Sequence, residues 1–287
     1  MKKLIVFIFI GFLAQLIDGS LGMAYGVTST SLLLTFGIAP AVASASVHLA
    51  EVVTTAASGA AHIRFGNVDR FLVKTMIIPG SVGAFVGACF LSSLPGEAVK
   101  PFIAGFLFFL GAYILYRFTF PSRIKQQETK PYTKKALIPL ALFAGFADAT
   151  GGGGWGPIST PVLLARRGIE ARKVIGSVDT SEFVIAASAS LGFFLSLGWQ
   201  EVNWYWVLTL MVGGLAAAPI AAWLVKMIPP HYLGVLVGGC ILLTNARTVA
   251  ASVSLPKSST WILYAVILFG WSCCLAYLIY TQKNNMS

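Results

Sequence analysis

Long apolar runs recur along this whole chain, and they constrain its fold more than any other feature. A run of about 20 apolar residues is long enough to cross the hydrocarbon core of a bilayer as one helix. Because lipid offers no partners to backbone N–H and C=O groups, such runs become helices that satisfy these groups internally. The sequence therefore predicts an all-α polytopic membrane protein. The apolar segments lie at 3–36, 40–63, 71–94, 98–120, 135–165, 173–197, 202–227, 231–253 and 260–280.

The composition agrees with a chain surrounded by lipid. Hydrophobic residues make up 57% of the 287 residues and charged residues only 10%. A soluble domain carries about a quarter charged residues, so this chain cannot cover a water-facing surface. The net charge of +10 is typical of short basic loops beside membrane helices, and no nucleic-acid partner is expected. We predict a single multi-pass transmembrane domain over 1–287, located in the plasma or inner membrane.

The chain also repeats itself, which indicates a duplicated fold. Gly37-Ile38 followed by the segment 46–51 reappears, at the same offset, as Gly168-Ile169 followed by the segment 177–182. Further matches pair Gly83 with Gly214, Val99 with Leu233 and Gly105 with Gly239. We expect repeat one at about 3–120, a cytoplasmic linker at 121–134, repeat two at about 135–254 and an extra C-terminal helix at 259–281.

Loop charges predict how the segments cross the membrane. Basic residues fill the linker before segment 135–165 and the loop after it, and basic loops stay on the cytoplasmic side. Segment 135–165 must therefore turn back within the membrane. Loop 37–40 carries no charge, so it is expected outside. Segment 3–36 should then also turn back within the membrane, entering from the side opposite to segment 135–165. The prediction is two inverted repeats, each opening with a Gly-rich broken or re-entrant segment, although Lys2 and Lys3 would then lie outside.

Glycine-rich stretches at 18–26 and 148–157 mark the proposed turns. Where a helix restarts after such a turn, unpaired N–H groups and the positive dipole end attract an anion. Tight helix packing is the alternative role for these glycines, and snorkelling to the interface is the alternative for Arg247. The predicted substrate-binding residues are Gly19, Gly22, Thr28, Ser29, Gly151, Gly152, Gly153, Gly154, Trp155, Ser159, Thr160 and Arg247.

Ionisable residues inside apolar segments form a second group of candidates. Burying a charge in the membrane is expensive, so these groups must be paired, protonated or next to a polar cavity. His48 and Glu51 share a helix face, as do Asp179 and Glu182, and the two pairs are expected to meet near the repeat axis. They either carry protons or form structural hydrogen bonds. The candidates for proton coupling or structural polarity are Asp18, His48, Glu51, Asp148, Asp179 and Glu182.

No metal or cofactor is predicted. A His-x-x-Glu pair such as His48 and Glu51 suggests a metal, but no second ligand cluster accompanies it in the sequence. The cysteines lie in apolar runs without metal-ligand spacing. No Gly-x-x-x-x-Gly-Lys-Ser/Thr loop is present, which argues against direct use of ATP.

The second Gly-rich stretch resembles a known signature. Residues 145–148, 151–157 and 160–164, together with Gly168, resemble the repeated motif of the TauE/SafE family of sulfite exporters. In repeat one, residues 19–23, Gly37 and 66–69 look similar, but Ser20, Leu21, Met23 and Ala24 stand where glycines are commoner. The resemblance implies an inner-membrane transporter with duplicated halves, linked to sulfite, sulfonates and related sulfur-containing anions.

The predicted function is a permease for small anions, most simply sulfite or an organosulfonate. A secondary carrier, in one form coupled to protons, is the first hypothesis, and an anion channel is the alternative. An intramembrane hydrolase is a third reading, but there is no Gly-x-Ser-x-Gly elbow, so no enzyme is predicted. The expected partners are a small anionic solute and the lipid bilayer.

Overall fold

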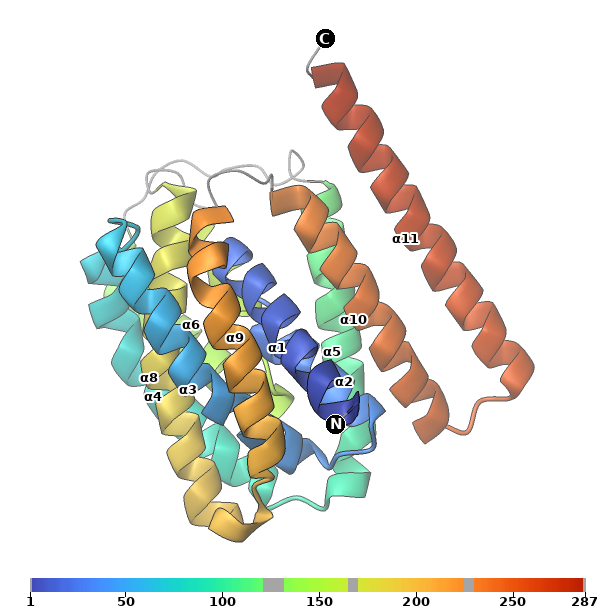
Figure 1. Cartoon of the computed structure of the whole chain (residues 1–287), viewed down its shortest axis with the longest axis horizontal. Coiled ribbons are helices and arrows are strands. Elements are labelled where there is room, and N and C mark those ends of the chain that lie inside the picture. Colours follow the sequence, from blue (N-terminus) through green and yellow to red (C-terminus); the bar gives the residue numbers. More distant parts are fainter. Residues whose placement is uncertain (1, 121–131, 165–169, 225–229, 286–287) are drawn as a thin grey trace.

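The computed structural model describes residues 2–120, 132–164, 170–224 and 230–285, and over these residues it is helical with no strand (Figure 1). This confirms the all-α prediction. The elements are α1 (Lys2–Leu21), α2 (Tyr25–Thr35), α3 (Pro40–Arg64), α4 (Arg70–Ser92), α5 (Gly96–Thr119), α6 (Lys134–Gly151), α7 (Trp155–Leu164), α8 (Ala171–Leu197), a 3-10 turn η2 (Trp199–Glu201), α9 (Trp204–Leu224), α10 (Pro230–Ser252) and α11 (Lys257–Asn285).

The seven uninterrupted apolar segments each form one helix, and local signals set their ends. Pro40 stands in the first turn of α3, where its missing N–H costs nothing. Asp69 caps α4, because its Oδ1 accepts hydrogen bonds from the amides of Phe71 and Leu72 at 2.8 and 3.2 Å. Gly66, just past the end of α3, has a φ of 71°, a left-handed conformation that stops the helix.

The two Gly-rich segments break into pairs of helices, as predicted. The chain leaves α1 through Gly22, with a φ of 65°, and leaves α6 through Gly152 and Gly153, with φ values of 68° and 152°. Only glycine adopts such backbone angles without steric cost. Ala24 also has a positive φ, of 106°, but its side chain makes this conformation sterically costly. The first break therefore stores backbone strain that the second break avoids.

Each broken pair folds back on itself as a hairpin. The ring of Phe7, early in α1, lies 5.5 Å from the ring of Phe36, just past α2. The hydroxyl of Tyr132, just before α6, donates a hydrogen bond to the carbonyl of Leu163 near the end of α7. Both ends of each hairpin therefore lie at the same end of the molecule.

The two hairpins enter from opposite ends of the helix bundle. Helix α3 carries the chain away from the hairpin formed by α1 and α2, and Asn67 follows its far end. There the carbonyl of Asn67 packs so closely on Gly176 that an added Cβ would lie 2.1 Å away. Since Gly176 is near the start of α8, the hairpin of α6 and α7 opens at this far end. This geometry is what an inverted arrangement requires.

Helices of the two halves interleave rather than forming two separate bodies. Helix α1 packs along α9, and α6 packs along α4 in the corresponding way. Helices α3 and α8 pack against each other, as do α5 and α10. Helix α11 lies at one side of the molecule against α10 and α5 and is largely exposed (Figure 1). The core therefore depends on contacts between the halves.

One predicted repeat match differs in the structure. Gly214 is equivalent to Gly80 and not to Gly83, because each of the first two glycines packs against the aromatic residue that begins a second hairpin helix. An added Cβ on Gly80 would lie 2.7 Å from the ring of Trp155, and one on Gly214 would lie 3.5 Å from the ring of Tyr25. An insertion before α9 shifts the register, which the matched glycines alone did not reveal.

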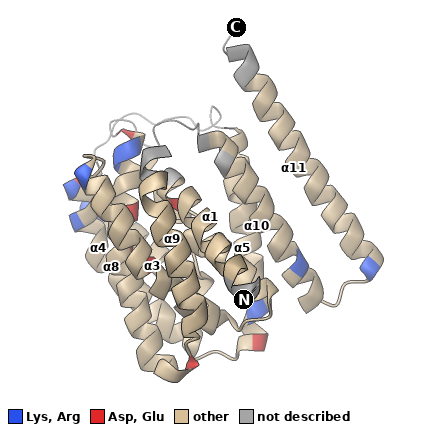
Figure 2. Ribbon diagram, in the orientation of Figure 1, with Lys and Arg blue, Asp and Glu red and all other residues tan. Residues whose placement is uncertain are grey.

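Six helices, α4, α5, α8, α9, α10 and α11, are long and apolar enough to cross a membrane. Their number confirms a multi-pass membrane protein. Most of the described basic residues lie near one end of the bundle, as the blue ribbon segments in Figure 2 show. At or near the helix ends that meet there, the sequence has Arg64, Arg70, Lys74, Arg117, Lys134, Lys135, Arg172 and Lys173. The positive-inside rule assigns this end to the cytoplasm, and we call it the cytoplasmic end.

Candidate functional site

The two helix breaks cross and bind each other. The hydroxyl of Thr160 in α7 donates a hydrogen bond to the carbonyl of Gly22 in the first break, at 2.8 Å. The hydroxyl of Thr30 in α2 donates to the carbonyl of Gly152 in the second break, at 2.6 Å. The two bonds are equivalent under the repeat. They satisfy break carbonyls that would otherwise be unpaired at membrane depth.

Glycines make this close crossing possible. An added Cβ on Gly153 would lie 2.2 Å from the backbone nitrogen of Val27, and one on Gly156 would lie 2.6 Å from the carbonyl of Gly22. The corresponding positions in the first hairpin are equally tight, since a Cβ on Gly26 would lie 2.8 Å from the Cα of Gly153. Backbone meets backbone here, so no side chain can move aside.

The remaining predicted glycines have packing roles. A Cβ on Gly19 would lie 2.7 Å from Ala221, and one on Gly151 would lie 2.4 Å from the ring of Phe106. Gly154 packs within its own hairpin, where an added Cβ would lie 3.0 Å from the backbone nitrogen of Asp148. At these three positions glycine therefore serves tight packing, which was the alternative role. At Gly22 and Gly152 it serves the crossing of the two breaks.

The amide groups at the restart of α7 are occupied, which corrects the expectation that they are free. Oδ1 of Asp148 accepts hydrogen bonds from the amides of Gly154 and Trp155, at 2.7 and 2.9 Å. In the other hairpin, Oδ1 of Asp18 accepts from the amide of Tyr25 at 3.3 Å. In both hairpins a carboxylate already stands where the positive helix end was expected to attract a solute anion.

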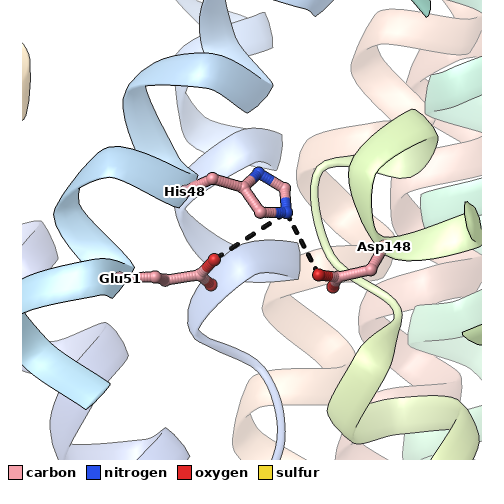
Figure 3. A group of neighbouring side chains, drawn as sticks. All are labelled: His48, Glu51 and Asp148. Atoms are coloured by element: carbon pink, nitrogen blue, oxygen red, sulfur yellow. Dashed lines mark hydrogen bonds and ion pairs between the residues drawn. The ribbon is translucent and has the colours of Figure 1, made fainter. Parts of the chain in front are cut away.

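Asp148 also belongs to a buried polar group with His48 and Glu51, which we call the His48 cluster (Figure 3). Nε2 of His48 lies 3.1 Å from Oδ2 of Asp148 and 3.9 Å from Oε2 of Glu51. All three side chains are at most 2% exposed. Figure 3 shows both carboxylates on the same side of the imidazole ring, facing Nε2.

Hydrogen bonds fix the tautomer of His48. Its Nδ1 lies 2.8 Å from the carbonyl oxygen of Ser44 and 3.2 Å from the hydroxyl of Ser44. That hydroxyl donates to the carbonyl of Ala149 at 2.7 Å, so Nδ1 donates to the Ser44 carbonyl. A neutral ring would then turn the lone pair of Nε2 toward two carboxylates. The cluster is satisfied only when a positive charge, such as a proton, sits among these three groups.

A second group is the repeat counterpart of the first. Asp18, Asp179 and Glu182 each contribute a carboxylate oxygen, and these oxygens lie within 4.8 Å of one another. We call this the Asp18 cluster. Oδ1 of Asp179 accepts a hydrogen bond from the hydroxyl of Ser58 at 3.1 Å, and Nε2 of His62 lies 3.9 Å from Oδ2 of Asp179. The whole group is buried.

Each of the two acidic pairs is completed by an aspartate of the other repeat, and Glu51 lies close enough to Glu182 for the two side chains to interact electrostatically. The pair His48 and Glu51 of repeat one takes Asp148 of repeat two, and the pair Asp179 and Glu182 of repeat two takes Asp18 of repeat one. Each cluster is therefore assembled across the halves. The reason is the crossing of the hairpins, which carries each aspartate over to the other repeat.

The side-chain donors near the crossing are of two kinds, those with a hydrogen-bond partner and those without one. Thr160 is committed to Gly22, and the indole N–H of Trp155 donates to the carbonyl of Val178 at 3.1 Å. Three other hydroxyls in the first two turns of α2 and α7 have no hydrogen-bond partner within the described part of the chain; they belong to Thr28, Ser29 and Ser159. These three remain donors that a solute can use.

Arg247 lies apart from the clusters, toward the end opposite the cytoplasmic one. It lines a cavity of about 480 Å³ together with Glu97 and Lys100 of α5 and the end of α2. The cavity is polar and lies at the base of the hairpin formed by α1 and α2. The structure thus places Arg247 in an outer vestibule and not at the crossing.

Sequence reasoning missed several residues of the site. Thr30, Ser44, Ser58 and His62 all bind or face cluster residues or break carbonyls. The available signal for Thr30 was an alignment of the two Gly-rich stretches on Asp18 and Asp148, which places Thr30 opposite the predicted Thr160. The others contact residues that are distant in sequence, and no local pattern marks them.

Ionisable groups buried at membrane depth around paired helix breaks are typical of solute pathways. Together with the multi-pass fold, they define this protein as a membrane transporter built from interlocked halves. Residues 7–248 match the family described as sulfite exporter TauE/SafE, and the chain belongs to this family. The resemblance seen in the Gly-rich motifs is thereby confirmed.

A relative supports the same assignment. The chain is 66% identical over 249 residues to a protein named "Probable membrane transporter protein YtnM" from Bacillus subtilis (strain 168). The matched region covers 86% of this chain and 83% of that protein. No solved structure matches the chain.

Proposed function

We propose that this protein is a secondary carrier for small sulfur-containing anions, such as sulfite or an organosulfonate, and that it couples their movement to protons. The family description names sulfite exporters, and the Bacillus subtilis relative is named a membrane transporter. The anion class rests on the family, and the coupling rests on the geometry of the two clusters.

One observation carries the coupling: the buried interior is strongly acidic. The buried carboxylates are Asp18, Glu51, Asp148, Asp179 and Glu182. An anion that entered this region while all five were ionised would meet strong repulsion in a medium of low dielectric constant. Solute binding therefore requires that positive charge enters first or at the same time. A channel that conducts only anions would be hindered by buried negative charges of this kind.

His48 is the natural place for the coupled proton. Its Nδ1–H is held by Ser44, so Nε2 is the atom that gains or loses a proton between Asp148 and Glu51. A protonated ring neutralises one carboxylate charge beside the crossing. Loss of that proton restores the repulsion and favours release of the anion.

The anion itself is expected at the crossing, beside the free hydroxyls of Thr28, Ser29 and Ser159. The vestibule with Lys100 and Arg247 collects anions from the side opposite the cytoplasm. Since the cluster side chains are almost fully buried, the hairpins must separate from the surrounding helices to expose the site to either side. Alternating exposure of this kind is the usual action of inverted-repeat transporters.

Flux measurements in vesicles test this proposal. The purified full chain is reconstituted, and uptake of labelled sulfite, methanesulfonate, sulfate and chloride is followed at two pH values. Saturable counterflow of a sulfur-containing anion that is driven by a pH gradient supports the carrier. Conductance that does not saturate and ignores the pH gradient identifies a channel. Flux of chloride alone overturns the substrate class.

A further inference from the structure

The Asp18 cluster lacks the internal positive charge that the His48 cluster has. Under the repeat, Asp179 occupies the position of His48, and Glu182 occupies the position of Glu51. One cluster is thus two carboxylates around an imidazole, and the other is three carboxylates. Three ionised carboxylates in a buried site repel one another strongly, and either protons or a bound metal cation must offset their charge.

Each carboxylate of this cluster keeps one oxygen free of hydrogen bonds. Asp18 uses Oδ1 for the amide of Tyr25, and Asp179 uses Oδ1 for the hydroxyl of Ser58. Oδ2 of Asp18, Oδ2 of Asp179 and Oε2 of Glu182 have no hydrogen-bond partner among the described residues. Buried acceptors without a partner are costly, so these oxygens indicate a missing ligand.

A buried amide beside the cluster lacks partners as well. Gln15 is 0% exposed, and neither its Oε1 nor its Nε2 has a hydrogen-bond partner in the described part of the chain. Gln15 and Ser58 both lie against Gly19, since an added Cβ there would be 3.7 Å from Nε2 of Gln15 and 3.5 Å from Oγ of Ser58. Ser58 in turn donates a hydrogen bond to Asp179, so the amide of Gln15 lies near a side chain that contacts the cluster.

The nearest imidazole does not supply the missing charge. His62 lies 3.9 Å from Oδ2 of Asp179, and its Nδ1 lies 3.4 Å from Nδ2 of Asn67. An amide that donates to Nδ1 leaves the single ring hydrogen on Nε2, so the ring is neutral. His62 then presents an N–H to one edge of the cluster and leaves its overall charge unchanged.

The surroundings favour a cation of a particular kind. Asp18 lies in the last turn of α1, where the helix dipole is negative. All available ligand atoms are oxygens, which suit hard cations and not zinc or copper. Three oxygens within 4.8 Å of one another fit around an ion at contact distances of about 2.4 Å.

We propose that the Asp18 cluster binds a sodium ion. Calcium takes 6–8 oxygen ligands and magnesium keeps several waters, whereas this buried site has three carboxylate oxygens and the unpartnered amide of Gln15 nearby. Half-helix ends near the bilayer midplane bind sodium in other transporters. A role for this sodium ion in driving anion movement rests on the proposed function. The binding of sodium to the Asp18 cluster does not.

Thermal unfolding of the purified full chain in detergent tests the binding. Sodium chloride replaces choline chloride at fixed pH and ionic strength, so that only the cation changes. A ligand that binds the native state raises the unfolding temperature in a saturable way, and sodium is expected to do so while potassium is not. Glu182→Gln removes the dependence on sodium. The matched variant Glu51→Gln, altered at the equivalent position of the His48 cluster, keeps it.

A second variant supplies the Asp18 cluster with an imidazole in place of one carboxylate. Asp179→His turns the Asp18 cluster into a copy of the His48 cluster, and the ring supplies the positive charge. We expect this variant to fold without sodium and to show no sodium-dependent shift. Direct binding of radioactive sodium to wild type, and its absence in Asp179→His, supports the same conclusion without a stability readout.

Three results would overturn the sodium site. They are an unfolding temperature equal in sodium and choline, a shift that calcium reproduces at lower concentration, and a sodium shift that survives in Glu182→Gln. Failure of the proposed function looks different: sodium would stabilise the protein and bind to it, but vesicles would show no flux of any sulfur-containing anion.

Discussion

At the scale of single residues, two threonines hold the crossing together. Thr30 and Thr160 each donate to a break carbonyl of the opposite hairpin. Replacement by valine keeps the shape and removes the bond, which leaves a buried carbonyl without a partner. We expect Thr30→Val or Thr160→Val to cost about 1 kcal/mol of stability.

The matched control is Thr28→Val. The hydroxyl of Thr28 has no partner in the described structure, so its removal is expected to leave the unfolding temperature of the detergent-solubilised protein unchanged. Equal losses in all three variants would show that the hydroxyl-to-carbonyl bonds contribute nothing specific.

Asp148 has two separate tasks, and one substitution separates them. In Asp148→Asn the amide oxygen still accepts from Gly154 and Trp155, but the negative charge beside His48 is lost. We expect the variant to insert and to remain within about 1 kcal/mol of wild-type stability, and we expect its proton-coupled flux to be abolished.

The control for this variant is Glu201→Gln, in the exposed turn η2, which should transport like wild type. Flux in vesicles and a size-exclusion profile of each protein are the measurements. Wild-type flux in Asp148→Asn would remove this carboxylate from the mechanism.

At the scale of elements, the crossing depends on backbone that approaches backbone. A methyl group at Gly153 would lie 2.2 Å from the nitrogen of Val27, and the φ of 152° is strained for alanine. We expect Gly153→Ala to destabilise the protein by more than about 3 kcal/mol, since steric overlap adds to the backbone strain.

Gly105→Ala is the matched control, because an added Cβ there meets nothing within 4 Å. In a helix interior this change stabilises by about 1 kcal/mol. Unfolding temperatures of both variants in the same detergent give the comparison. A Gly153→Ala protein as stable as wild type would mean that the two breaks do not touch.

The elements themselves were largely predictable from sequence. Apolar run length gave the helices, and glycine density gave the breaks at 22–24 and 152–154, because both depend on local composition. The pairing of the hairpins was not predictable, because a bond such as that from Thr30 to Gly152 joins residues far apart in sequence.

The candidate site was predictable only in part. Burial cost singled out all the cluster residues, from Asp18 to Glu182, but it could not say which aspartate joins which pair. The expected free amides of α7 are occupied because Asp148 reaches across the glycine turn to cap them. An aspartate one turn before such a break is a capping signal as well as a buried charge.

At the scale of the whole molecule, α11 stands outside the interlocked halves. It contacts mainly α10, through the indole of Trp271, which donates to the carbonyl of Val235 at 2.9 Å. The family match ends at residue 248, before this helix begins. We expect a chain that ends at Ser254 to insert, fold and transport as the full chain does.

Flux and unfolding temperature of the shortened chain measure this. A fall in the unfolding temperature of a few degrees is compatible with the loss of one peripheral helix. Loss of folding would show that α11 is part of the core and not an addition to it.

The central claim is that the two hairpins enter the membrane from opposite sides and meet. The native cysteines, Cys89, Cys240, Cys273 and Cys274, are first replaced by serine or alanine. Single cysteines are then introduced at Thr133 and Glu170, the two ends of the α6–α7 hairpin. A third variant carries a cysteine at Gly37, at the end of the other hairpin. A membrane-impermeant maleimide is applied to right-side-out vesicles. The account predicts that Gly37→Cys is labelled and that Thr133→Cys and Glu170→Cys both react only after the vesicles are opened. Labelling of only one of the last two from outside would contradict it, because α6 and α7 would then cross the membrane instead of turning back.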